Sequence, residues 1–275
     1  MNYEPRTNKA FTLIELLVAI AILAMVLVFA GAIFKVCAES HRTAIANTEI
    51  MQKLRAITDQ LNADFKGVIL TSPGRVSFNI SGIGNVRSDC IAFLAIGDFQ
   101  STRQYYGKTV IGDVASIFYG QAADGEPAIL PNIDPIAGDP KEKILLRRQT
   151  ILTDDPDLID PCLPPIGEYS KFSLSQWDAN SPFPNIDAWT ARPAIKTNNL
   201  GSDVVMYMAK GVDDFTIQYW DGPSRRWVPE DQDIPSLPKS QGINTNAFKF
   251  TFTLYDSKGV IKNGRIFTHI VYLGD

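Results

Sequence analysis

The sequence predicts an α+β protein in which one long N-terminal helix packs on antiparallel β-sheet. Two observations lead to this prediction. Apolar residues run almost unbroken from Phe11 to Phe34 and then recur at helical spacing as far as Phe65. Beyond Arg75 the pattern changes to short runs rich in Val, Ile, Phe and Tyr, separated by glycine-containing turns, which is typical of antiparallel strands.

The first part of this helix is long enough to span a membrane. Between Phe11 and Phe34 only Thr12 and Glu15 are polar. About 24 residues at ~1.5 Å rise make a helix of ~36 Å, against a hydrocarbon core of ~30 Å. A conventional secretory signal peptide is the alternative, but its apolar region is only about 7–15 residues long. Residues 11–34 are therefore predicted to form a transmembrane helix.

Glu15 needs a partner, because an ionisable group on a membrane helix costs several kcal/mol when it is left alone. Cleavage between Ala10 and Phe11 would place a new α-amino group on Phe11, one turn before Glu15. That amine would supply a cation at the same depth, in the same subunit or in a neighbour.

Residues 1–10 would then be a leader peptide. Arg6 and Lys9 on this segment favour a cytoplasmic position for it, by the positive-inside bias. The rest of the chain is accordingly expected on the extracytoplasmic side.

The run Lys9-Ala10-Phe11-Thr12-Leu13-Ile14-Glu15-Leu16 resembles the class III signal of type IV pilins and type II secretion pseudopilins. The resemblance implies that a membrane-embedded prepilin peptidase cleaves after Ala10 and methylates the amine of Phe11. It also implies that Glu15 neutralises the N-terminus of a neighbouring subunit during filament assembly. The residue before the cut is usually Gly in this family, and here it is Ala10.

Residues 35–66 are predicted to continue the same helix as an amphipathic segment. Apolar residues at helical spacing form a stripe that is expected to pack on a sheet: Ile50, Leu54, Ile57, Leu61 and Phe65. A free coiled-coil stalk is the alternative, but only about two heptads are present, and sustained heptads are needed for that structure. Gly67 and the Ser72-Pro73-Gly74 run are expected to end the helix.

Residues 67–275 are predicted to form an extracytoplasmic β-rich domain. The expected strands cover residues 75–80, 90–96, 114–119, 143–152, 204–209, 215–220, 247–255 and 265–273. A proline-rich region, residues 121–199, is expected to consist of long loops around the single strand at 143–152.

Parts of this domain look like the J-type minor pseudopilin of type II secretion and the related W-type minor pilin. The similarity lies in residues 52–68, 143–148, 211–222 with Trp227, and 237–239. It implies a minor, structural subunit at the tip or initiation complex of a type II secretion pseudopilus. The alternative is a minor pilin of a type IV pilus, used for adhesion, motility or DNA uptake.

The same resemblance implies the location and the partners. The chain would be a single-pass protein of a bacterial inner membrane with its soluble domain in the periplasm. Its partners would be the prepilin peptidase and other minor and major pseudopilins, contacted through the N-terminal helix and the β domain. The formal net charge of -4 gives no electrostatic reason to expect a nucleic-acid partner.

No enzymatic activity, cofactor or metal site is expected from the sequence. His41 and His269 are the only histidines, too few for a multi-histidine metal site. Ser236 and Lys239 have a Ser-x-x-Lys spacing, but Pro238 disrupts the helical turn that this pair needs. A membrane-tethered hydrolase or a sugar-binding module, the alternative of another class, would require convergent polar groups in a pocket.

Three further features have a functional and a structural interpretation. Asp154, Asp155, Asp157 and Asp160 can offer oxygens to Ca²⁺, or form a solvated acidic loop. Cys90 and Cys162 can pair in an oxidising periplasm, or remain buried thiols. Trp220 and Trp227 flank a turn and form either an exposed aromatic patch or a cross-strand pair, which is the commoner arrangement.

Overall fold

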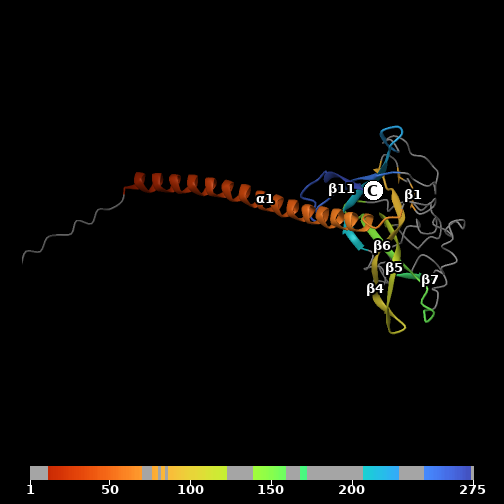
Figure 1. Ribbon diagram of the computed structural model, residues 1–275. Helices are drawn as coiled ribbons and strands as arrows, with labels where there is room; N and C mark the ends of the chain where they lie inside the picture. Colours follow the sequence, from red (N-terminus) through yellow and green to blue (C-terminus); the bar gives the residue numbers. More distant parts are fainter. Residues whose placement is uncertain are drawn as a thin grey trace, which may run out of the picture.

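The computed structural model describes residues 12–69, 76–79, 82–83, 86–122, 139–158, 168–171, 207–228 and 245–273. One helix, α1 (Leu13–Phe65), runs for 53 residues and projects far from a β domain that encloses its C-terminal part (Figure 1). The predicted α+β architecture is confirmed. Helical spacing of the apolar residues and the absence of proline allow the helix to continue unbroken from the apolar segment into the domain.

Two sheets make up most of the domain. The larger has the order β1-β4-β5-β6-β7, with β8 also paired to β6, and the smaller has the order β10-β9-β11-β12. The strands of the larger sheet are β1 (Val76–Asn79), β4 (Cys90–Tyr105), β5 (Lys108–Gln121), β6 (Ile144–Thr153), β7 (Tyr169–Lys171) and β8 (Tyr207–Lys210). Those of the smaller are β9 (Val212–Asp221), β10 (Arg226–Val228), β11 (Ala247–Leu254) and β12 (Arg265–Tyr272). A separate short ribbon pairs β2 (Gly82–Ile83) with β3 (Val86–Arg87).

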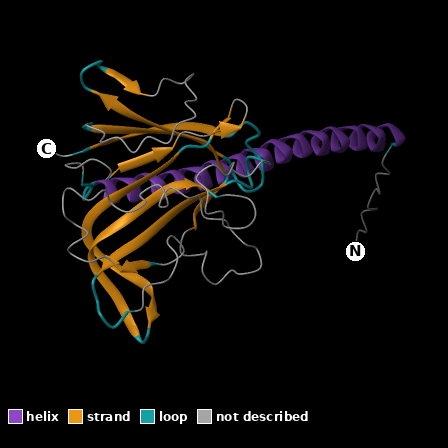
Figure 2. Ribbon diagram, turned by 90° about the vertical axis from the view of Figure 1, so that its right-hand side faces the viewer, coloured by secondary structure: helices purple, strands orange, loops and turns teal. Residues whose placement is uncertain are grey.

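The domain end of α1 lies between the two sheets, which Figure 2 shows on opposite sides of the helix. The predicted stripe faces this interior: Ile50, Ile57, Leu61 and Phe65 are buried, and Leu54 packs against the same cluster. Their neighbours come from both sheets, including Phe93 on β4 and Phe250 on β11. The helix is therefore part of one core shared with both sheets, and the stalk alternative is excluded.

The helix ends where it meets β4. The backbone N–H of Ile96 donates to the carbonyl of Gly67 at 2.8 Å, and that of Ile69 donates to the carbonyl of Leu94 at 2.9 Å. A Cβ atom at position 67 would lie 2.0 Å from the carbonyl oxygen of Ile96. Only glycine permits this approach, so Gly67 ends the helix by letting the chain join the sheet.

The hairpin of β4 and β5 is longer than expected. Both strands extend past the predicted bounds of 90–96 and 114–119 and meet at a two-residue turn, Tyr106-Gly107, in which both residues have positive φ. Beyond Ile96 the side chains of β4 alternate between exposed and half-buried apart from the buried Ser101, because this part of the hairpin projects past the main core. The apolar runs used for the prediction end where the core ends, although the strands continue.

The proline-rich region holds a second strand in addition to the expected one. β6 pairs antiparallel with β5, and the short β7 pairs with β6 in parallel, which departs from the otherwise antiparallel pairing. Three residues of β7 are too few to give a periodic signal. Residues 123–138, 159–167 and 172–199 of this region lie outside the described residues.

Buried polar contacts join the two sheets. Lys143, just before β6, pairs with Asp213 of β9 at 2.5 Å, and the Gln121 amide donates to the carbonyl of Val212 at 2.7 Å. Asp89, which is fully buried, accepts a hydrogen bond from the backbone N–H of Ile217 at 2.8 Å. These contacts fix the relative position of the sheets, and therefore the direction in which α1 leaves the domain.

Candidate functional site

The predicted processing and assembly residues lie at the start of the chain. Ala10 and Phe11 are outside the described residues. Glu15 lies in the first turn of α1, where it forms a capping box with the N-cap residue Thr12. The Glu15 carboxylate accepts hydrogen bonds from the Thr12 backbone N–H at 2.9 Å and from its hydroxyl at 3.0 Å, while the Glu15 N–H donates to the Thr12 hydroxyl oxygen at 3.3 Å.

This geometry shows a function of Glu15 that the sequence analysis missed. The Thr12-x-x-Glu15 spacing is a capping-box signature that satisfies backbone donors at a helix N-terminus. The contacts supply hydrogen bonds but no positive charge. A carboxylate within a membrane therefore keeps its need for a cation.

The N-terminal half of α1 exposes its apolar side chains along its whole length. Leu13 is 82% exposed, Val28 72% and Phe34 77%. In the described part of the chain, α1 is the one helix long and apolar enough to cross a membrane. So large an apolar surface requires lipid or other helices around it.

An ion pair between the buried Asp64 and the largely buried Arg147 holds the other end of α1 on the larger sheet. Arg147 of β6 donates to Asp64 through Nε and Nη2 at 2.6 and 2.7 Å, a two-point contact. The Tyr119 hydroxyl also donates to Asp64, and Gln60 adds a bond of 3.0 Å. Burial, together with the Asp64 charge, raises the pKa of Tyr119 well above its usual value, so the hydroxyl keeps its proton and remains a donor.

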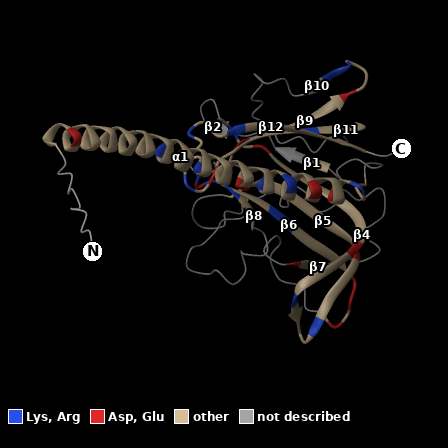
Figure 3. Ribbon diagram, turned by 90° about the vertical axis from the view of Figure 1, so that its left-hand side faces the viewer, with Lys and Arg blue, Asp and Glu red and all other residues tan. Residues whose placement is uncertain are grey.

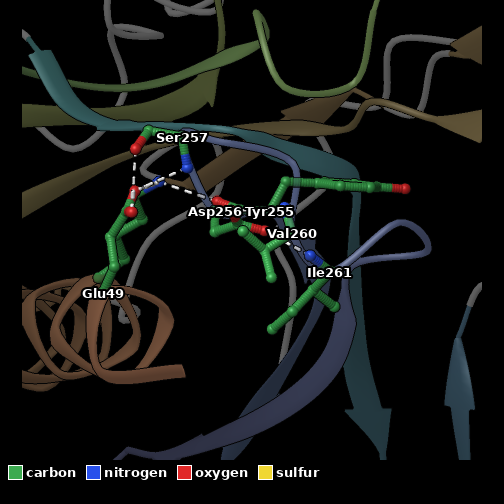
Figure 4. A network of polar contacts seen from close by, with 7 residues as sticks. Glu49, Tyr255, Asp256, Ser257, Val260 and Ile261 are labelled. Atoms are coloured by element: carbon green, nitrogen blue, oxygen red, sulfur yellow. Dashed lines mark hydrogen bonds and ion pairs between the residues drawn. The ribbon is translucent and has the colours of Figure 1, made fainter. Parts of the chain in front are cut away.

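A second contact fixes α1 nearer the membrane-spanning segment, at the loop between β11 and β12 (Figure 4). Glu49 accepts hydrogen bonds from the Ser257 backbone N–H at 2.9 Å and from its hydroxyl at 3.0 Å. Lys53 pairs with Glu49 and donates to the carbonyl of Tyr255, both at 2.9 Å. Within the loop, Asp256 accepts from the backbone N–H groups of Val260 and Ile261, each at 2.9 Å.

The two carboxylates of this contact are stabilised in their charged forms. Burial alone would raise the pKa of Asp256, but the backbone hydrogen bonds from Ile261 and Val260 lower it below its usual value. Burial likewise opposes ionisation of Glu49, and the hydrogen bonds from Lys53 and Ser257 outweigh it and lower the pKa.

These lowered pKa values predict a loss of stability in acid. A carboxylate with a lower pKa in the folded state contributes stability above its unfolded pKa, and this is lost as pH falls through the folded value. Between about pH 4.5 and pH 3, the wild-type free energy of unfolding should fall more steeply than that of Asp256→Asn, measured by urea titration of the detergent-solubilised chain. At pH 7 the variant should be less stable by about 1 kcal/mol. Parallel pH profiles would contradict this assignment.

The other sequence candidates occupy ordinary structural positions. His269 is half-buried on β12 and lies 2.9 Å from the Asn62 side chain of α1, and His41 is exposed on α1. Burial lowers the pKa of His269. The two tryptophans form a cross-strand pair between β9 and β10, with ring centroids 5.4 Å apart, as the commoner interpretation predicted.

The acidic turn after β6 is held by protein contacts. Asp157 pairs with Lys108, and its N–H donates to Asp155 at 2.9 Å. No group of three or more potential metal ligands occurs within the described ranges. Asp160, Cys162, Ser236 and Lys239 lie outside those ranges, whereas Cys90 is buried on β4.

Sequence reasoning missed the residues that fix the domain to the helix. Asp64 and Glu49 lie in the segment predicted as an amphipathic helix, and Arg147 lies in the strand predicted at 143–152, but none of the three was singled out. The sequence did contain a signal for such a contact: a charged residue lies beside the apolar stripe of the helix, and an arginine lies inside a predicted strand. The partner could not be chosen without the strand register.

Comparison with known proteins identifies the N-terminal segment. The family model of the prokaryotic N-terminal methylation motif, which is typical of type IV pilins and pseudopilins, matches residues 5–31. No curated protein matches the chain. The motif and the exposed apolar helix together indicate a membrane-anchored, single-pass protein.

Proposed function

From the N-terminal methylation motif of type IV pilins and pseudopilins, we propose that this chain is a minor pseudopilin, a structural subunit in the tip or initiation complex of a type II secretion pseudopilus. A prepilin peptidase cleaves the precursor after Ala10 and methylates the new N-terminus at Phe11. Before assembly the subunit is held in the bacterial inner membrane with its β domain in the periplasm. The protein acts by assembly and has no catalytic role.

The main support for this proposal is the continuity of α1 and the different surroundings of its two halves. One unbroken helix exposes an apolar surface over its first half and is buried between two sheets over its second half. Such a helix passes from lipid into a bundle of similar helices without refolding, because lipid tails and apolar side chains are equivalent surroundings for it. Other minor and major pseudopilins would provide those helices.

Glu15 is proposed to direct this bundling. Its hydrogen bonds to Thr12 hold the carboxylate beside the helix N-terminus, whose partial positive charge favours an anion. The methylated ammonium of Phe11 on a neighbouring subunit would complete the neutralisation in an apolar environment. The pairing would set the axial position of one subunit against the next.

The anchoring of the β domain supports a role for its surface in choosing partners. The Asp64–Arg147 pair and the Glu49–Ser257 contact fix the domain at two points of α1. The position of the helix in a bundle therefore determines which domain surface meets the next subunit. The same arrangement would serve a minor pilin of a type IV pilus, and incorporation into a secretion pseudopilus or a retractile pilus distinguishes the two.

Two substitutions separate the charge of Glu15 from its capping function. Glu15→Gln retains a capping-box residue but removes the charge, whereas Thr12→Ala weakens the cap by about 1 kcal/mol and leaves the charge. In cells with an active prepilin peptidase, Glu15→Gln should insert and be processed, but enter filaments roughly ten-fold less or worse. Thr12→Ala should assemble nearly as the wild type does. Filament yield and mass spectrometry of the N-terminus measure both.

The assembled wild-type protein should begin with methylated Phe11. Retention of residues 1–10 in filaments would contradict the processing step. Normal assembly of Glu15→Gln with failure of Thr12→Ala would show that Glu15 acts as a helix cap alone, and would overturn the pairing role.

A further inference from the structure

Exposed lysine and arginine side chains lie on two segments at the end of the β domain that faces the membrane-spanning half of α1. The β11–β12 loop lies at this end (Figure 1), and Figure 3 shows Lys and Arg, with Asp and Glu beside them, where α1 enters the domain. We call the exposed cations of α1 residues 35–45 and loop residues 255–265 the basal rim: Lys35, Arg42, Lys258, Lys262 and Arg265. In these two segments Glu39 is the one exposed carboxylate. The whole chain, by contrast, has a net charge of -4.

These cations are not engaged elsewhere in the part of the chain that the structure describes. Each charge pair found there joins other residues, among them Glu49 with Lys53 and Glu142 with Lys210. A concentration of unneutralised like charge is unfavourable for the folded domain unless an anion lies near it. The rim is therefore expected to have an external partner.

A hollow of about 280 Å³ opens between α1 and the loop within this rim. Arg42 and Lys258 line it from the two elements. Ile45 and Val260 add apolar surface, being 47% and 37% exposed. The lining also contains the carboxylates of Glu49 and Asp256. The charge of Glu49 is offset by Lys53 at 2.9 Å, and Asp256, which is 1% exposed, accepts hydrogen bonds from the backbone N–H groups of Val260 and Ile261.

The cations that line the hollow lie close enough to the membrane-spanning segment to reach the surface of a bilayer. From Phe34, the last residue of the apolar run, α1 rises ~12 Å to Arg42, at about 1.5 Å per residue. The headgroup layer occupies roughly 5–8 Å of this rise. An extended arginine or lysine side chain and an ordinary helix tilt of about 20° span the remainder.

We propose that the basal rim binds the headgroup phosphates of anionic phospholipids in the membrane that α1 crosses, with one phosphate in the hollow between Arg42 and Lys258. The apolar surfaces of Ile45 and Val260 meet the adjoining glycerol region. The contact holds the β domain against the bilayer and limits the tilt of α1 in the unassembled subunit. This inference rests on the membrane anchor and is independent of the secretion role.

The position of the rim favours lipid over an acidic protein partner. A neighbouring subunit would lie beside α1, whereas Lys258, Lys262 and Arg265 lie in or beside the β11–β12 loop, at the end of the domain nearer the membrane-spanning half of α1 (Figure 1). In the proposed orientation the rim cations also lie on the extracytoplasmic side of the membrane, directly after the membrane-spanning segment. Lysine and arginine are disfavoured at this place by the positive-inside bias. An anionic leaflet compensates for that placement, because each cation near its surface gains attraction.

Hydrogen exchange in nanodiscs tests this proposal on the full-length chain. Discs of phosphatidylcholine alone are compared with discs that contain phosphatidylglycerol. Amides of the β11–β12 loop should exchange roughly five-fold more slowly in the anionic discs, the factor that about one cation–lipid contact provides. Lys258→Gln/Lys262→Gln should lose this difference. The matched control Arg225→Gln/Arg226→Gln removes two exposed cations from the β9–β10 hairpin and should keep it.

High salt should abolish the difference, since it screens contacts at an exposed surface. Equal exchange in the two kinds of disc would overturn the proposal. So would protection that appears only when acidic partner subunits are added, which would assign the rim to a protein interface. Failure of the chain to enter either disc would contradict the membrane anchor itself, and this inference with it, whereas altered filament assembly alone would bear only on the proposed function.

Discussion

Asp64→Ala is expected to lower the free energy of unfolding by about 3 kcal/mol, because it leaves Arg147 as an uncompensated, largely buried cation. Asp64 is 6% exposed and accepts two bonds from Arg147 and one from Tyr119. The better helix propensity of alanine offsets only about 0.5 kcal/mol of the loss. Urea titration of the detergent-solubilised chain, followed by tryptophan fluorescence, measures the change.

Two comparisons separate this ion pair from a general effect of losing a carboxylate. Asp59→Ala removes an exposed carboxylate from the same helix and should change stability by less than about 0.5 kcal/mol. The double variant Asp64→Leu/Arg147→Met removes both charges, so its loss should be smaller than the sum of the single losses. A loss below about 1 kcal/mol for Asp64→Ala, the size found for surface pairs, would show that the pair does not anchor the helix.

The sequence was sufficient to predict the elements whose signal is local. The apolar run and the stripe from Ile50 to Phe65 predicted one helix that packs on sheet, because burial on one helix face produces a periodic pattern. Runs of β-branched and aromatic residues located most of the strands. The capping box was missed although its signal is also local, because Thr12 and Glu15 are three residues apart in the chain.

Features that depend on distant residues were not predictable in the same way. Asp64, Tyr119 and Arg147 lie far apart in the chain, and only the register of β5 and β6 brings the last two to the end of α1. The Glu49–Ser257 contact similarly joins residues 208 positions apart. The hollow of the basal rim is likewise lined from both segments, by Arg42 of the helix and Lys258 of the β11–β12 loop.

Phe65→Ala is the second substitution expected to cause a large loss of stability, because Phe65 lies in the core shared by α1 and both sheets. Phe65, the last residue of α1, is 1% exposed and contacts aromatic rings of both sheets. Its ring centroid lies 4.2 Å from that of Phe93 on β4, 5.4 Å from Phe248 and 5.5 Å from Phe250 on β11. Truncation removes these contacts and leaves a cavity where the three elements meet, at a cost of about 3–5 kcal/mol.

Phe34→Ala is the matched control, because it makes the same substitution on the same helix at a side chain that is 77% exposed. Urea titration should show little change for this variant and a large loss for Phe65→Ala, with Phe65→Leu between them because it keeps most of the volume. Phe65 contacts both sheets and therefore helps to fix the orientation of α1 relative to the β domain. Phe65→Ala should therefore reduce filament assembly even at temperatures where the domain remains folded. Equal stability of the two alanine variants would mean that the sheets are held together without the helix, and that the orientation of the domain is set by the Asp64 and Glu49 contacts instead.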